Sequence, residues 1–177
     1  MGQDITCLIT DKNIELDKNI VHFKVRGFTF IPFETSASWG IEMAKDFDLL
    51  SNYILYLESE HHLNDCRYNR NGDHFDLDIF KMVKDYQIEN FIIEHHYEWA
   101  DIPVDYCFMQ VADGAITKNS LVYDESEYSK GNWAHVQESK TNFGLNFDWL
   151  AMTDLFYSYF HSERFYFQQQ IMKGSNL

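Results

Sequence analysis

Residues 85–117 read DYQIENFIIEHHYEWADIPVDYCFMQVADGAIT, and how this stretch folds determines which architecture the sequence predicts. The stretch contains seven carboxylates and two adjacent histidines, but it has no lysine and no arginine. Wound as a helix, the part before Pro103 separates its apolar side chains from Glu94, Glu98 and Asp101. We therefore predict an amphipathic helix whose exposed face is acidic.

A β-strand is the alternative for the same residues. Side chains at 91–99 fall into two alternating sets, one of Phe91, Ile93, His95, Tyr97 and Trp99 and the other of Ile92, Glu94, His96 and Glu98. We prefer the helix because it separates charge from apolar bulk and because the pattern is longer than a typical strand. The acidic face has a cost, since carboxylates at i,i+3 and i,i+4 destabilise a helix by roughly 0.2–0.5 kcal/mol per pair.

Composition indicates a single domain covering residues 1–177. Of the 177 residues, 45% are apolar and 17% are aromatic. This is enough for a buried core that needs no disulfide bond or bound metal ion to stabilise it. The 28 acidic and 14 basic residues give a net charge of −14. This charge argues against direct binding to nucleic acid or to an anionic membrane, and it leaves open a basic partner, a cation or no charged partner at all.

The cysteines and the apolar segments indicate a cytoplasmic protein. Cys7, Cys66 and Cys107 are widely spaced and odd in number, so we expect reduced thiols rather than a disulfide framework or a zinc ribbon. The sequence opens without a basic leader or an apolar run of signal length. No stretch approaches the ~20 apolar residues of a membrane span, so we expect no membrane partner.

The N-terminal half predicts two strands followed by two helices. Gly27 indicates a bend within the second strand, and Pro32 is expected to end it. Either of two serines can cap the first helix. The predicted elements are strands at 4–10 and 20–30, a helix from Ser36 or Ser38 through Leu57, and a helix at 76–85.

The second half predicts a hairpin and a long helix. A hairpin at 104–123 is expected to turn at Asp113-Gly114, because both positions of such a turn need positive φ. A short strand is expected at 133–137. Residues 146–172 predict a helix nearly encircled by aromatic side chains, which would either fill the core or form a homodimer interface. The expected fold class is α+β, a small antiparallel sheet packed by about four helices.

Two Glu-His-His groups are candidate metal ligands, and they support a metal-dependent enzyme as an alternative function. Imidazole and carboxylate together suit zinc, iron or manganese. A di-iron bundle would need a second Glu-x-x-His pair, and the zincin motif is absent. His95 lies on the apolar face of the predicted helix, where a hydrogen-bonded core imidazole is the commoner occupant. The candidate ligands are Glu58, His61 and His62 in the first group and Glu94, His95 and His96 in the second.

Other catalytic signatures are missing. The sequence has no G-x-x-x-x-G-K-[ST], G-x-G-x-x-G or G-x-S-x-G motif, so neither a phosphate loop nor a nucleophile elbow is supported. Catalytic residues are therefore unknown, no cofactor is favoured, and we expect binding rather than catalysis.

The leading hypothesis is a small acidic protein that binds and neutralises a basic protein. Immunity proteins act in this way against nuclease toxins, and some phage inhibitors imitate nucleic acid. The hypothesis requires an exposed acidic face that Lys81, Lys84 or another base of the same chain does not neutralise. The expected contact residues are Glu94, Glu98, Asp101, Asp105, Asp124, Glu125 and Glu127, with Tyr97 and Trp133 as aromatic anchors. A structural homodimer through residues 146–172 is the third alternative.

Overall fold

The computed structural model describes residues 4–18, 20–33, 37–66, 75–99, 102–117, 121–123 and 134–149. These residues form an antiparallel sheet with helices on both faces, which confirms the predicted α+β class. The strands are β1 (Asp4–Thr10), β2 (Phe23–Val25), β3 (Phe28–Phe33), β4 (Phe91–Trp99), β5 (Ile102–Ala112), β6 (Ala115–Ile116) and β7 (Leu121–Tyr123). The helices are α1 (Ser38–Ala44), α2 (Leu50–Glu60), α3 (Phe75–Asp85) and α5 (Ala134–Phe143), with a 3-10 turn η1 (Leu63–Asp65).

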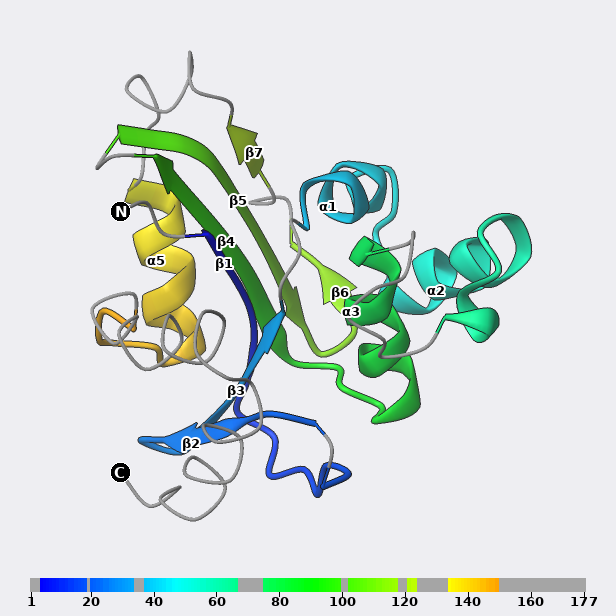
Figure 1. Cartoon of the computed structure of the whole chain (residues 1–177), viewed down its shortest axis with the longest axis horizontal. Helices are drawn as coiled ribbons and strands as arrows, with labels where there is room; N and C mark the ends of the chain where they lie inside the picture. Colours follow the sequence, from blue (N-terminus) through cyan, green and yellow to red (C-terminus); the bar gives the residue numbers. More distant parts are fainter. Residues whose placement is uncertain are drawn as a thin grey trace.

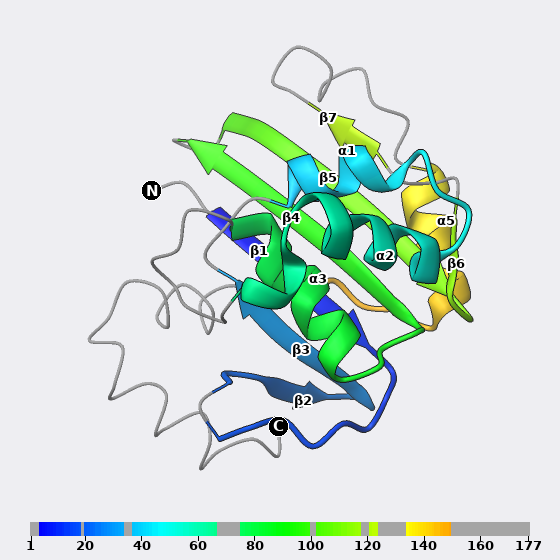
Figure 2. The same cartoon turned by 90° about the vertical axis from the view of Figure 1, so that its right-hand side faces the viewer.

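The sheet places β1 and β4 at its centre. Its strand order is β2-β3-β1-β4-β5-β6, and β7 also pairs with β5. Helices α1, α2 and α3 lie on one side of the sheet, while α5 lies on the other (Figures 1 and 2). Two hydrophobic clusters follow from this layering, one beneath α1, α2 and α3 and one beneath α5. Both faces of the central strands are therefore buried.

The predicted helix before Pro103 is wrong, and the strand alternative is correct. Phe91 and Ile93 of β4 join the cluster beneath α1, α2 and α3, whereas Ile92 joins the cluster beneath α5. Adjacent residues of a strand point to opposite faces, so a strand buried on both faces needs apolar residues in consecutive positions. The run Phe91-Ile92-Ile93 meets that need.

The predicted strand at 20–30 is a hairpin of two strands. Arg26 and Gly27 form its turn with φ values of 50° and 88°, the conformation that joins short antiparallel strands. Pro32 lies inside β3 and does not end it. Because β2 pairs only with residues 28–30, the Pro32 position lies beyond the end of β2, where the strand tolerates a proline.

The helix predicted through Leu57 is two helices, α1 and α2. Between them the chain is tied to the turn of the β5–β6 hairpin, since the backbone N–H of Ile116 donates to the Asp48 carbonyl at 2.9 Å. The Leu50 N–H donates to the Gly114 carbonyl at 2.9 Å, and this contact fixes the start of α2. These bonds replace the helical bonds that a continuous helix would have made.

The other predictions have mixed outcomes. The strand at 4–10, the helix at 76–85 and the Asp113-Gly114 turn are confirmed, and both turn residues have positive φ. The strand predicted at 133–137 is wrong, because the helix α5 begins at Ala134. Residues 146–149 are not helical, and the rest of the predicted helix at 146–172 lies outside the described residues. None of the helices that the structure describes combines the length and the apolar character needed to span a bilayer.

Candidate functional site

Glu94 is the best-connected polar side chain in the described part of the chain, and it is only 1% exposed. Lys140 of α5 places its Nζ 3.1 Å and 3.0 Å from the two carboxylate oxygens of Glu94. Tyr106 of β5 donates its hydroxyl to Oε1 at 2.7 Å, and Trp149 donates its indole N–H to Oε2. The charge of Glu94 is therefore compensated inside the molecule.

This burial corrects the prediction that Glu94 contacts a basic partner. A carboxylate withdrawn from water must be paired and hydrogen-bonded, and the pairing base here comes from α5. Lys140 lies 46 residues away in sequence, so the stretch at 85–117 gives no sign of it. The binding hypothesis required acidic side chains that no base of the same chain neutralises. Glu94 does not meet this requirement, because Lys140 neutralises it.

The remaining predicted contact residues do not gather into one described surface. Asp105 and Tyr97 are partly exposed and pair across β4 and β5, on the sheet face opposite to Glu94. Asp105 Oδ2 lies 3.9 Å from His95 Nε2. Glu98 is described only through its backbone in β4. Asp101, Asp124, Glu125, Glu127 and Trp133 lie outside the described residues.

Both histidines of β4 are buried. His95 is 2% exposed, and its Nδ1 lies 2.7 Å from Thr6 Oγ1 of β1. His96 points to the other face of the sheet, where its ring is perpendicular to the Tyr106 ring at 6.3 Å. Because neighbouring strand residues face opposite ways, His95 and His96 do not converge on one ion.

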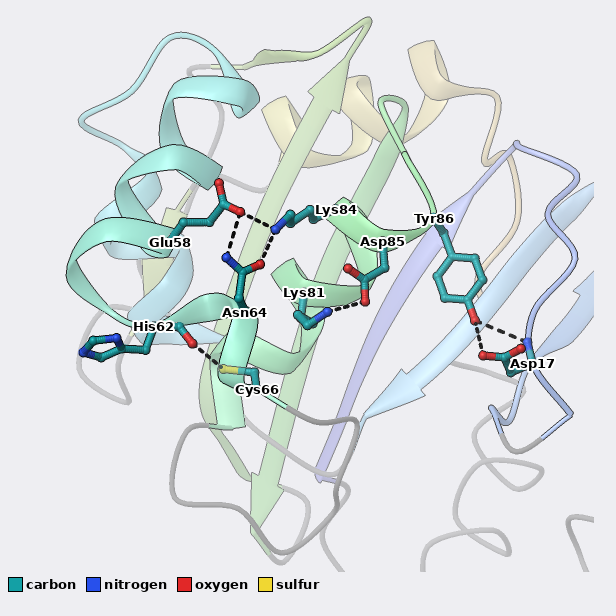
Figure 3. Close-up of polar contacts among 9 residues, drawn as sticks. All are labelled: Asp17, Glu58, His62, Asn64, Cys66, Lys81, Lys84, Asp85 and Tyr86. Carbon is teal, nitrogen blue, oxygen red and sulfur yellow. Dashed lines mark hydrogen bonds and ion pairs between the residues drawn. The ribbon is translucent and has the colours of Figure 1, made fainter.

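In the first Glu-His-His group, at the end of α2, Glu58 and His61 contact other side chains and not each other's ligand atoms. Glu58 accepts hydrogen bonds from Lys84 of α3 and from Asn64 of η1, as Figure 3 shows. The Lys84 hydrogen bond, supported by Asn64, lowers the pKa of the Glu58 carboxyl. His61 Nε2 lies 3.2 Å from the Tyr56 hydroxyl, and His62 is exposed. Across the described segments, no three His, Cys, Asp or Glu side chains are placed to hold a metal ion.

A different acidic segment comprises α1, α2 and η1. Residues 37–66 contain six acids and one base, the lysine at position 45, which gives 1 − 6 = −5 for this segment. The acids are Glu42, Asp46, Asp48, Glu58, Glu60 and Asp65. We call the exposed side chains of residues 37–66 the helical-layer surface, and the three helices that carry or flank it face the viewer in Figure 2.

The same surface carries exposed apolar side chains. Among the residues whose side chains are described, the large hydrophobic ones that are exposed are Trp39 at 43%, Leu49 at 47% and Leu55 at 62%. All three belong to the helical-layer surface.

Aromatic rings support Trp39 from one side. The Trp39 ring lies 5.0 Å from the His61 ring, with the two planes at 84°. His61 also packs against Tyr56 at 5.3 Å, and Tyr56 packs against Phe47 at 5.3 Å. The indole is thus held by a row of rings that links α1 to the end of α2.

Two arrangements therefore stand out, the buried Glu94 centre and the helical-layer surface. The first is closed to solvent by burial, so only the second is available to a partner. It combines exposed carboxylates with the exposed side chains of Trp39, Leu49 and Leu55. Comparison with protein-family models, with curated proteins and with solved structures found no match to this chain.

Proposed function

We propose that this protein binds a basic protein partner through the helical-layer surface, in the manner of an inhibitor or an immunity protein. The observation that carries the proposal is that residues 37–66 expose five acids, one base and the side chains of Trp39, Leu49 and Leu55. Apolar anchors supply the area buried on binding, while surrounding charges steer the partner and suppress wrong ones.

Among the residues that the structure describes, two lysines that contact this segment are engaged in ion pairs. Lys45 pairs with Glu42, and Lys84 of α3 pairs with Glu58. Asp46, Glu60 and Asp65 are exposed on the same surface and form no ion pair with any residue that the structure describes. They belong to a chain with a net charge of −14, whose field attracts cationic surfaces and repels nucleic acid.

A pair of charge-matched variants tests the proposal. Asp46→Asn, Glu60→Gln and Asp65→Asn together remove three charges from the helical-layer surface. Asp11→Asn, Glu15→Gln and Glu138→Gln remove three exposed charges elsewhere, so both variants have a net charge of −14 + 3 = −11.

Each protein is immobilised, exposed to an extract of the source cells, and its retained proteins are identified by mass spectrometry. We expect the wild type and the second variant to retain the same basic protein, and the first variant to lose it. Retention of acidic or neutral proteins only, or equal retention by all three proteins, would contradict the proposal.

A further inference from the structure

We propose that the Trp39 indole is the subsite for an arginine side chain of the basic partner. This inference rests on the proposed function and specifies which part of the helical-layer surface recognises the partner. It uses the exposure of the ring, the groups that hold it and the charges beside it.

The ring is exposed and held in place at once. Trp39 retains 43% of its exposure although its ring packs against His61 at 5.0 Å. The His61 ring is fixed in turn by the Tyr56 hydroxyl, which lies 3.2 Å from Nε2. A ring that is already positioned loses little side-chain freedom on binding, and this favours aromatic residues as anchors.

The chemistry of the ring and its neighbours favours a guanidinium group. Tryptophan has the strongest cation–π face among the aromatic residues. A planar guanidinium stacks on such a face and is less strongly hydrated than a lysine ammonium. Glu42 follows Trp39 by three residues on α1, a spacing that makes the two side chains neighbours on a helix, and Glu60 directly precedes His61 in the sequence.

The existing partner of Glu42 does not close the subsite. Lys45 binds Glu42 in an exposed pair, with the two side chains 35% and 61% exposed. Exposed pairs of this kind contribute little stability, so an incoming guanidinium can compete for the carboxylate.

The test compares octa-arginine with octalysine as defined probes. Trp39→Leu keeps an apolar side chain but removes the π face, and Trp39→Phe keeps a weaker one. Leu55→Ala is the matched control, because it also truncates an exposed hydrophobic side chain of the helical-layer surface. Circular dichroism verifies that each variant is folded.

We expect Trp39→Leu to weaken binding of octa-arginine about fivefold, with Trp39→Phe in between, and octalysine to change less than about twofold. Leu55→Ala should leave the ratio of the two affinities unchanged. Octa-arginine should also shift the tryptophan emission of the wild type, and this shift should vanish in Trp39→Phe.

Two other results would overturn the inference, and they separate it from the proposed function. If Trp39→Leu weakens both peptides equally or neither, while the Asp46, Glu60 and Asp65 variant weakens both, the arginine subsite is wrong and the acidic binding surface stands. If that charge variant also binds octa-arginine as tightly as the wild type, the proposed function and the subsite both fail.

Discussion

Glu94 determines how α5 is attached to the sheet. The sequence of α5 is mostly polar, and its buried residues are Val136, Ser139 and Lys140. Hydrophobic burial alone therefore attaches this helix weakly, and the ion pair of Lys140 with Glu94 fixes where the helix lies. Desolvation offsets most of the attraction in a buried ion pair, so an intact pair contributes little net stability.

Removing one partner of this pair should be far more harmful than removing both charges. We expect Lys140→Met to lower the free energy of unfolding by about 3 kcal/mol, because it leaves Glu94 buried without its base. Adding Glu94→Gln to that variant should recover about 2 kcal/mol relative to the sum of the single losses. Urea unfolding of the four proteins measures this, and purely additive losses would show that the pair does not couple.

Asp78 makes the stability of the fold depend on pH. Burial raises the pKa of this α3 carboxyl from its usual 3.8 to about 6. The folded state therefore holds the Asp78 proton more tightly than the unfolded state does. The contribution of Asp78 to stability is fully present below its unfolded pKa and is lost as the pH rises through its folded pKa.

The variant Asp78→Asn should consequently be stabilised at pH 7 by about 1 kcal/mol, a value reduced for the partial exposure of the group. At pH 4 the gain should be small, because the wild-type carboxyl is then protonated in the folded state. Asp65→Asn, an exposed substitution on η1 that removes the same charge, is the control. Urea unfolding at both pH values gives the answer, and an equal gain at pH 4 and pH 7 would refute the role of ionisation.

At the level of elements, the sequence predicts those parts whose signals are local. The strand at 4–10, the helix at 76–85 and the Asp113-Gly114 turn each carry their own alternation, periodicity or turn chemistry. β4 was mistaken for a helix because layers on both of its faces come from distant segments, and local alternation does not report them. The break between α1 and α2 was missed for the same reason, since it depends on a contact with the β5–β6 turn.

The candidate site was predicted less well than the fold. Its charge sign was evident from composition, but its location was not, because the base that neutralises Glu94 comes from α5. The compensating bases that the sequence suggested are engaged elsewhere, Lys81 with Asp85 and Lys84 with Glu58 (Figure 3). Ion pairing between elements depends on tertiary structure and is invisible to periodicity.

The turn between β5 and β6 gives an element-level prediction. Gly114 has a φ of 75°, and a Cβ added there would meet no atom within 4 Å, so only the backbone conformation resists substitution. We expect Gly114→Ala to lower the free energy of unfolding by about 1 kcal/mol, and Gly114→Asn to lower it less. Thermal unfolding compares the two, and an alanine variant as stable as the wild type would contradict the importance of this turn conformation.

In the described part of the chain, negative charge is present at the buried Glu94 and on the helical-layer surface, and of these two only the surface charge can act on a partner. The segment at 37–66 accounts for −5 of the net charge of −14 and also carries the exposed Trp39, Leu49 and Leu55. A basic partner steered by this field should associate more slowly as salt is added. At 0.1 M salt, counterions screen the attraction between exposed charges that are more than about 10 Å apart.

An NMR titration locates the binding surface most directly. Backbone amide resonances of the 21.1 kDa protein are followed while octa-arginine is added at low salt. We predict that the shifted resonances cluster in residues 37–66, with those of β4 and β5 unchanged. Shifts concentrated at 91–112, or spread evenly over every exposed carboxylate, would contradict a binding surface on α1 and α2.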